Sequence, residues 1–426
     1  QVNNVLCFPF IFRGALDVGA TTINEEMKLA CVRAIADLAM AESSAEVAGA
    51  YGDAELTFGP EYLIPKPFDP RLIARIAPAV AKAAMDSGVA TRPIADLEAY
   101  AEKLTEFVYK TSLFMRPVFN QARKDIKRIV LTEGEDERVL HAAQQVVSQK
   151  LAFPILVGDA KLIEERLHSQ GLTIQPGKDF ELIDIKNSPY YEASWKEYYN
   201  LRKRSGVTEE MARRRLKANT TLVGALLVRL GHADGLVCGT MGRFHDHFAV
   251  MEEVIGYNNP EKEAFAMNAL ISNKGNFFIA DTYINENPTA EQLANGTLMC
   301  AAEMKRIGLK PKVALVSNTN YGSNRNPDAN KMQQALELIR ELDPALEIDG
   351  EMQADVALDE TMRKSIFPET TLSGAANLLV MPNVEAANIS YNLLRVNATN
   401  GITVGPILMG LNKPVQIVTP ISTVRR

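Results

Sequence analysis

The stretch KVALVSNTNYGSNRNPDANKMQQALELIRELD, residues 312–343, contains the pattern from which the fold can be inferred. Its first five residues are mostly apolar. They are followed by a loop rich in asparagine, serine and glycine, and then by apolar residues at helical spacing. A buried strand, a polar loop and an amphipathic helix in this order are typical of parallel α/β sheets. Ligands bind at the carboxyl ends of the strands in such sheets, so the loop is a candidate binding segment.

The same alternation extends to both sides of this stretch. Further apolar runs lie between amphipathic segments, at residues 129–134, 154–159, 233–239, 276–284, 376–383 and 414–420. Continuous apolar strands that alternate with helices predict α/β layers around mostly parallel sheets. We therefore expect the α/β fold class for the larger, C-terminal part of the chain.

The first part of the chain has a helical pattern instead. Residues 23–40 carry apolar side chains at helical spacing, and Asn24 is the expected N-cap. The Gly/Pro-rich residues 49–70 are expected to be a loop. Residues 96–124 are expected to form one or two connecting helices.

Residues 69–88 predict another helix of this first part. Asp69 can cap its start, Pro70 suits its first position and Gly88 suits its end. Because Pro78 lacks a backbone N–H and lies inside the segment, we expect a kink or a break there.

Composition excludes some classes of function. The chain has 426 residues, 46% hydrophobic and 23% charged, with a net charge of −6, which is ordinary for a globular protein and argues against nucleic acid as a partner. We expect the basic run Arg213-Arg214-Arg215 to be a solvated helix face. The sequence contains no stretch of 18 consecutive apolar residues, so it predicts no membrane span.

The cysteines and the first residues indicate the cellular compartment, and the two ends of the sequence indicate a fragment. Cys7, Cys31, Cys238 and Cys300 are scattered without a C-x-x-C spacing, which indicates a reduced, cytoplasmic compartment. The first residues lack the basic start and apolar run of a signal peptide. Both ends are abrupt, so we expect the sequence to be a fragment of a longer polypeptide.

Several motifs occur in one order along residues 112–426: ADGLVCG, NPTAEQLA, KVALVSNTNYGS, EIDGEMQADVAL, GAANLLVMPNVEAANISYNLLR and GPILMGLNKPV. Together they resemble phosphate acetyltransferases over nearly this whole region. The resemblance implies a domain at residues 116–426, made of two α/β subdomains with a cleft between them. Subdomain 1 would contain residues 116–258 and 405–426, and subdomain 2 residues 259–404. These transferases pair through the second subdomain, so we expect a dimer or a higher symmetric oligomer.

The start of the chain resembles another family. The motif Val2-Asn3-Asn4 followed by FPFIFRGALD, and its continuation ALDVGATTINEEMKLACVRAIADLA, resemble the end of the catalytic region of malic enzymes. In that family an asparagine of the pair touches malate near the nicotinamide, and Asn3 and Asn4 match it. The alternative is a turn in which the two side chains bind nearby backbone groups. We expect residues 1–94 to be the tail of a malic enzyme domain and residues 95–115 a helical linker.

The rest of a malic enzyme's machinery is missing from this sequence. No G-x-G-x-x-G follows a strand, and no metal-binding carboxylate cluster or Tyr/Lys acid–base pair can be assigned. The parent enzyme would convert malate and NADP to pyruvate, carbon dioxide and NADPH with a divalent metal, Mg or Mn. The fragment itself is expected to be inactive and to bind no metal or NADP.

Five positions carry the acetyltransferases' arginines for CoA and phosphate. Arg138, Arg202 and Arg395 match three of them, whereas Ala249 and Pro420 stand at the other two. A guanidinium fork suits the phosphates of CoA. The alternative for each retained arginine is a surface ion pair, worth about 0–1 kcal/mol.

The last residues lack the side chains that serve acetyl transfer in the family. The family has Ser, Arg and Asp where this chain has Thr419, Pro420 and Arg426. Proline cannot hold a phosphate and arginine cannot act as a general base, although Arg425 and Arg426 add positive charge for CoA. The resemblance thus implies an inactive domain that binds acetyl-CoA as an allosteric effector, with inhibition as the expected sign. The expected effector site consists of Arg138, Arg202, Asn318, Tyr321, Gly322, Ser323, Asn324, Arg395, Thr419, Pro420, Arg425 and Arg426.

One short motif invites a metal interpretation. In His245-Asp246-His247 the neighbouring side chains diverge on a helix or a strand, so they chelate poorly without a third ligand. We expect no metal there.

The pairing of a malic-enzyme tail with an acetyltransferase-like region resembles the large bacterial NADP-dependent malic enzymes. The chain is therefore expected to be the regulatory C-terminal part of such an enzyme. Two alternatives remain open: a working phosphate acetyltransferase, and a structural domain for oligomerisation.

Overall fold

The computed structural model consists of two compact units, residues 1–116 and 117–426. The structure describes residues 6–41, 63–65, 69, 71–108, 110–272, 275–324, 326–397 and 402–424; for residues 105–108, 110–116, 272 and 402 it describes the backbone alone. Asn3, Asn4, Arg425, Arg426 and most of the expected loop at residues 49–70 lie outside the described residues.

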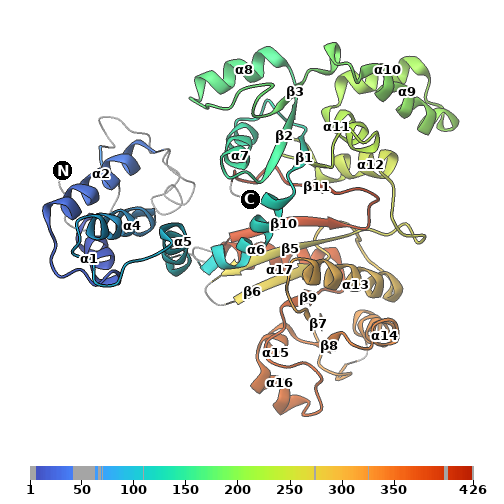
Figure 1. Ribbon diagram of the computed structural model, residues 1–426. Coiled ribbons are helices and arrows are strands. Elements are labelled where there is room, and N and C mark those ends of the chain that lie inside the picture. The colour runs from blue at the N-terminus through green and yellow to red at the C-terminus, as the bar shows by residue number, and fades with distance from the viewer. Residues whose placement is uncertain are drawn as a thin grey trace. The chain divides into compact units, whose positions relative to one another are not determined.

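The first unit is helical. Its described helices are α1 (Phe8–Asp17), α2 (Glu25–Met40), α4 (Arg71–Asp86) and α5 (Leu97–Val108) (Figure 1). They bury one apolar core that includes Met27, Ile76 and Leu104. The expected N-cap is confirmed, because the side chain of Asn24 accepts a hydrogen bond from the backbone N–H of Met27.

The helix expected over residues 69–88 is also present. The Asp69 carboxylate accepts a hydrogen bond from the backbone N–H of Arg71, and Gly88 follows the helix with a φ of +73°. Of the expected kink or break at Pro78, the break is absent, because α4 continues through it from Arg71 to Asp86. Apolar residues on both sides of Pro78, such as Ile76 and Val80, are fully buried, and this packing keeps the helix in one piece.

The first sheet of the second unit has five parallel strands in the order β11-β4-β1-β2-β3. The strands are β1 (Lys127–Leu131), β2 (Ala152–Val157), β3 (Glu181–Ile183), β4 (Gly235–Cys238) and β11 (Val415–Ile417). Its helices are α7 (Glu137–Ser148), α8 (Ala160–Ser169), α9 (Tyr191–Arg202), α10 (Glu209–Ala218), α11 (Thr220–Arg229) and α12 (Phe244–Val254), and α6 (Lys110–Lys124) precedes β1.

Helices cover both faces of this sheet. Val130 and Ile155 pack with residues of α9, α11 and α12 in one core, whereas Leu156 packs with α7 and α8 in another. Because successive residues of a strand point to opposite faces, the apolar runs of β1 and β2 supply both cores.

The second sheet has six strands in the order β10-β5-β6-β9-β7-β8. They are β5 (Phe265–Ser272), β6 (Gly275–Ala280), β7 (Lys312–Val316), β8 (Glu347–Met352), β9 (Leu378–Val380) and β10 (Ile402–Met409). β6, β9, β7 and β8 run parallel, while β10, β5 and β6 pair antiparallel. The remaining helices are α13 (Ala290–Arg306), α14 (Pro327–Leu342), α15 (Ala354–Leu358), α16 (Glu360–Ile366) and α17 (Val384–Asn397).

The expected α/β fold class with mostly parallel sheets is confirmed, and the seven apolar runs all contain strands. The sequence placed the return to the first subdomain at residue 405, but β10 still pairs with β5 up to Met409. The first returning strand is β11 (Figure 1). Among the described residues, no helix is long and apolar enough to cross a membrane.

Candidate functional site

Three neighbouring strands of the first sheet, β1, β4 and β11, end side by side at its carboxyl edge. Gly239 follows β4 with a φ of +100°, and a Cβ there would lie 2.4 Å from the carbonyl oxygen of Val418. Only glycine fits this approach, which brings the turn after β4 against the tail after β11. Parallel sheets bind ligands at such an edge.

Arg138, at the start of α7, holds this edge together. Its Nη1 donates to the carbonyl oxygens of Pro420 (2.5 Å) and Ser422 (3.1 Å), and its Nη2 donates to that of Thr240 (2.9 Å). Nε and Nη2 also bind the Asp136 carboxylate, at 3.0 and 2.6 Å. A guanidinium has five N–H donors, so each one has a partner within the protein. A ligand phosphate could contact Arg138 only by displacing one of them.

The tail after β11 is closed on itself. Thr419 is buried, its backbone N–H donates to the Ser422 hydroxyl at 3.1 Å, and the two hydroxyl oxygens are 3.3 Å apart. Pro420 contributes its carbonyl to Arg138 and has no donor of its own. The described part of the tail therefore offers neither a free cation nor an unpaired hydroxyl where the acetyltransferases have their serine and arginine.

Glu133 lies beneath this edge, and sequence reasoning missed it. Its carboxylate accepts hydrogen bonds from the backbone N–H of Gly239 (3.1 Å) and from the hydroxyl of Thr132 (2.9 Å). Burial raises the pKa of the carboxyl group, although these donors oppose the effect. Its place two residues after β1, in the motif TEGEDER, was the only available signal.

His247 has a structural role. Its Nε2 donates to the carbonyl of Met241 at 2.7 Å, which leaves Nδ1 to accept from the Thr221 hydroxyl at 2.8 Å. Asp246 instead pairs with Arg243. In the part of the chain that the structure describes, no group of three His, Cys, Asp or Glu side chains could hold a metal ion.

Arg202 lies at the end of α9, away from this edge. Its guanidinium is 3.6 Å from Glu253, near the end of α12, and its buried Nε has no hydrogen-bond partner in the protein. Ala249 is exposed one turn earlier on α12. The tail lies near the start of α12, whereas Arg202 lies near its end. A ligand that touches both the tail and Arg202 would therefore extend along this helix.

We call the first sheet with its helices the first lobe and the second sheet with its helices the second lobe. Arg395 lies on α17 of the second lobe and has fewer polar partners than the other two matched arginines. Its guanidinium lies 5.8 Å from the centre of the Tyr391 ring. Among the described residues, no acidic side chain forms an ion pair with it. The half-buried side chain thus carries donors that an anion can use.

The polar loop after β7 is organised by a second buried carboxylate, Glu351. It accepts hydrogen bonds from the Thr319 hydroxyl (2.8 Å), the backbone N–H of Gly322 (3.0 Å) and the side chain of Gln333 (2.9 Å). The Tyr321 ring does not project outward but stacks on Phe367, with 4.4 Å between ring centres.

Three polar side chains of the loop are turned toward solvent or toward each other. Asn318, Ser323 and Asn324 are exposed, and Asn318 accepts a hydrogen bond from Asn326 at 3.2 Å. Asn320 bonds to Gln353, which follows β8, at 2.9 Å. The structure therefore groups the predicted loop residues at the carboxyl edge of the second sheet.

A contact between two rings joins the carboxyl edges of the two sheets. Phe244, the first residue of α12 after β4, stacks on Tyr283, which follows β6, with 4.7 Å between centres. The predicted residues thus form four groups: Arg138 with the tail, Arg202 with Glu253, Arg395 with Tyr391, and the loop with Glu351. No described hydrogen bond or ion pair links one group to another.

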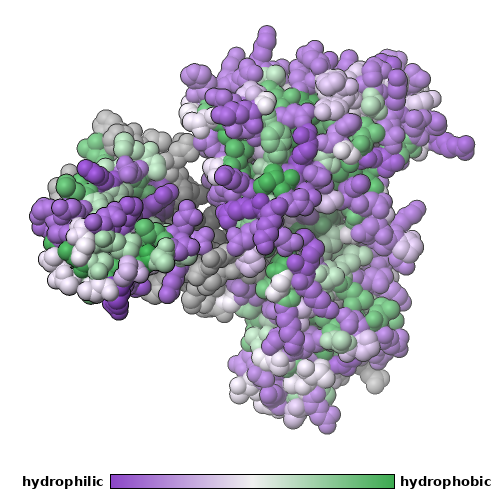
Figure 2. Space-filling model, viewed as in Figure 1, coloured by the Kyte–Doolittle hydropathy of each residue, from purple (hydrophilic) through white to green (hydrophobic). Residues whose placement is uncertain are grey.

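The basic run on α10 is only partly the solvated face that we expected. Arg213 lies 3.7 Å from the centre of the Trp195 ring and Arg215 lies 5.3 Å from that of Tyr198. Arg214 is exposed. Figure 2 shows hydrophilic side chains over this outer rim of the first lobe.

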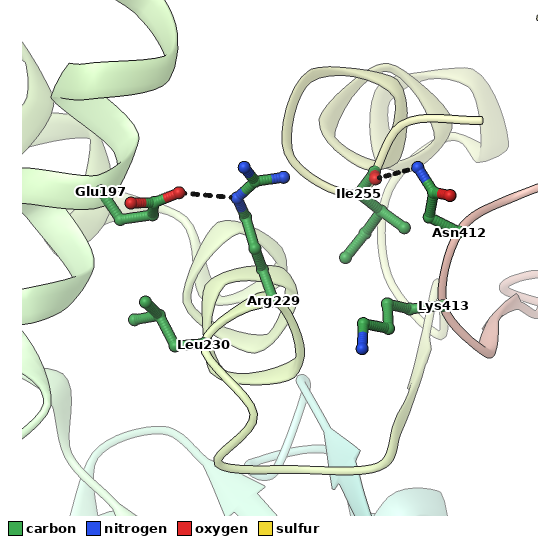
Figure 3. A pocket seen from close by; sticks show the side chains of 6 residues that line it. All are labelled: Glu197, Arg229, Leu230, Ile255, Asn412 and Lys413. Carbon is green, nitrogen blue, oxygen red and sulfur yellow. Dashed lines mark hydrogen bonds and ion pairs between the residues drawn. The ribbon is translucent and has the colours of Figure 1, made fainter. Parts of the chain in front are cut away.

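A pocket of about 430 Å³ lies at the opposite, amino edge of the first sheet, where α11 and α12 end. It is lined by Glu197, Arg229, Leu230, Ile255, Asn412 and Lys413 (Figure 3). Arg229 donates to Glu197 and to the carbonyl of Val254, both at 2.8 Å. The cations offset the negative ends of two helices, and none of the predicted site residues lines this pocket.

Comparison with known proteins gives a consistent result. A family model described as phosphate acetyl/butaryl transferase matches residues 113–426. The chain is 60% identical over 426 residues to NADP-dependent malic enzymes of Salmonella typhimurium and Escherichia coli, covering 100% of this chain and 56% of each relative. It thus spans about half the length of these relatives. The EutD phosphotransacetylase structure from Staphylococcus aureus matches with a TM-score of 0.66 at 30% identity, over 74% of this chain and 94% of that one.

Proposed function

Because the chain belongs, through residues 113–426, to the phosphate acetyl/butaryl transferase family, we propose that this region is a regulatory domain that has lost acetyl transfer and kept acetyl-CoA binding. The match of the whole of this chain to about half the length of bacterial NADP-dependent malic enzymes supports a second part of the proposal. The chain is the C-terminal portion of a cytoplasmic enzyme that converts malate and NADP to pyruvate, carbon dioxide and NADPH with Mg or Mn. Acetyl-CoA, which forms downstream of pyruvate, inhibits it.

The proposed domains follow the sequence expectation. Residues 1–94 are the tail of the malic enzyme domain, residues 95–115 a linker and residues 116–426 the regulatory domain. Asn3 and Asn4 belong to the malate site of the parent enzyme.

The observation that carries the loss of transfer is the closed turn at Thr419–Ser422. Pro420 supplies only a carbonyl, and Arg138 spends its donors on that turn, on Thr240 and on Asp136. Removing one group that stabilises transition-state charge costs about 10²–10³ in rate. We expect no acetyl phosphate from acetyl-CoA and phosphate; a turnover number in the ordinary range of about 1–10³ s⁻¹ would revive the transferase alternative.

The retained cations support binding of the effector. Arg395 has no acidic partner among the described residues, and Arg202 has a single long ion pair and a buried Nε without a partner. Both suit the phosphates of CoA. We propose that the effector reaches from Arg202 along α12 to the carboxyl edges of the two sheets, where it lies close to the loop residues Asn318–Asn324 and to the tail, and where Arg425 and Arg426 add charge.

Arginine substitutions test this site. A charge-assisted hydrogen bond is worth about 1.5–3 kcal/mol, so Arg202→Ala and Arg395→Ala should each weaken acetyl-CoA binding roughly 10–100-fold. In the full-length enzyme the same changes should blunt inhibition while leaving uninhibited malate turnover intact. The matched control is Arg306→Ala, because among the described residues this exposed arginine pairs with Glu303 alone, within α13. If both variants keep full affinity and full response, the effector does not use this site.

Self-association is proposed on separate evidence. On α17, Ile389, Leu393 and Val396 form an apolar stripe at helical spacing, with exposed fractions of 52%, 61% and 79%. Contiguous exposed apolar surface can mark a protein–protein interaction site. Pairing through the second lobe would cover it and give a dimer or a higher symmetric oligomer.

A further inference from the structure

Cys7 and Cys31 lie against each other in the first unit, and the proposed function uses neither thiol. Cys7 is the N-cap residue of α1 and Cys31 lies on α2. Their Sγ atoms are 3.3 Å apart, and both are free thiols. A disulfide has an S–S distance of about 2.05 Å, so the two atoms need to approach by only about 1.2 Å.

The two thiols differ in their surroundings. Cys31 is fully buried in the helical core, and burial, together with the neighbouring Cys7 thiol, raises its pKa to about 12. Cys7 lies at the edge of the same core and is partly exposed. A small oxidant dissolved in water therefore reaches Cys7 first, while Cys31 remains protected until its neighbour has reacted.

We propose that Cys7 and Cys31 form an oxidative modification site, which a peroxide converts into a disulfide bond between α1 and α2. In the first step the Cys7 sulfur attacks hydrogen peroxide, the O–O bond breaks, and a sulfenic acid and water form. In the second step the Cys31 sulfur attacks the Cys7 sulfur and displaces its hydroxyl group as water. Two thiols are oxidised, one peroxide is reduced and two waters leave.

The alternative is that both cysteines serve only as small apolar groups of the core. Cys238 and Cys300 illustrate that situation, because each is fully buried and no described cysteine lies beside it. Burial raises the pKa of both thiols well above the ordinary value. They serve as internal references for thiols that should not react.

The position of the pair gives the modification a consequence that rests on the proposed function. Cys7 follows Asn4, a proposed malate-site residue, by three positions in the sequence. A bond to α2 would tether the chain next to that residue. Oxidation of the full-length enzyme should therefore lower malate turnover and leave acetyl-CoA binding unchanged, and dithiothreitol should restore the rate.

The test treats the whole chain with hydrogen peroxide, removes the excess, alkylates the remaining thiols after denaturation and maps the peptides by mass spectrometry. The expected result is a cross-linked peptide pair containing Cys7 and Cys31, with Cys238 and Cys300 alkylated. In Cys31→Ala the cross-link should disappear, and a sulfenic acid trap such as dimedone should label Cys7. The matched control Cys300→Ala, which removes an equally buried thiol, should form the cross-link as the parent does.

Two results would overturn the proposal: four alkylated cysteines after exposure to peroxide, or trapping of Cys7 in the unsubstituted chain while Cys31 remains a thiol. Both can be read on the unsubstituted protein, so they do not depend on how a variant folds. If the cross-link forms but malate turnover in the full-length enzyme stays the same, the modification site stands and its link to the malate site fails.

Discussion

Replacing Arg138 should release the tail from the carboxyl edge of the first sheet. In Arg138→Ala the carbonyls of Thr240 and Ser422 lose a charged donor, whereas the exposed Pro420 can turn to water. Each such bond contributes about 1.5–3 kcal/mol. The side chain is 35% exposed, so water recovers part of the loss. We expect the free energy of unfolding to fall by about 2–4 kcal/mol.

Urea unfolding measures the stability, and hydrogen exchange of residues 419–424 reports on the tail itself. Arg138→Lys is the matched control: it keeps the charge but not the fork, so it should recover part of the stability. Acetyl-CoA binding should weaken in parallel with faster exchange of the tail. A stability within about 0.5 kcal/mol of the parent, as for an ordinary surface substitution, together with unchanged exchange, would refute the assignment of Arg138 as a clamp.

Three further outcomes are expected. Arg363 is fully buried and donates to four backbone carbonyls, those of Val356, Ala357, Leu372 and Gly374. Arg363→Met should therefore lower the free energy of unfolding, measured in urea, by about 3–5 kcal/mol. An unchanged urea midpoint would contradict this prediction. Burial alone would raise the pKa of Glu347, but hydrogen bonds from Lys310 and Ser373 lower this pKa from 4.5 to about 2. The carboxylate therefore stabilises the fold above pH 4.5, and this contribution is lost as the pH falls through 2. Glu347→Gln should flatten the dependence of the unfolding free energy on pH in that window, and an unaltered pH dependence would contradict this prediction. Leu393→Asp on the apolar stripe of α17 should shift sedimentation toward the 46.9 kDa species, and the proposal of self-association fails if the parent already sediments as that species at micromolar concentration.

The sequence predicted the parallel strands well because their apolar runs are continuous. β8 was not among these runs, since EIDGEM, with three acidic residues in six, looks like a loop. Its Asp349 and Glu351 are nevertheless buried, because Thr370 and Arg340 bind the first and the loop after β7 binds the second. A strand whose carboxylates are hydrogen-bonded by residues distant in the sequence cannot be recognised from the local pattern.

The candidate site shows the same limit. The match to acetyltransferase motifs identified Arg138, Arg202 and Arg395, but it gave no reason to distinguish one from another. The structure distinguishes them by what they already bind: backbone carbonyls and Asp136 for Arg138, Glu253 for Arg202, and an aromatic ring for Arg395. Such partners depend on segments up to 284 positions apart, which no local motif records.

Whether this chain is an inactive acetyl-CoA sensor can be tested by a calorimetric titration with acetyl-CoA, followed by an assay for acetyl phosphate on the same sample after adding phosphate. We predict saturable heat of binding, weaker binding in Arg395→Ala, and no acetyl phosphate. Acetyl phosphate formation at ordinary enzyme rates would show a working transferase, and the absence of any binding heat would leave only a structural role; either result would contradict the proposal of an acetyl-CoA sensor.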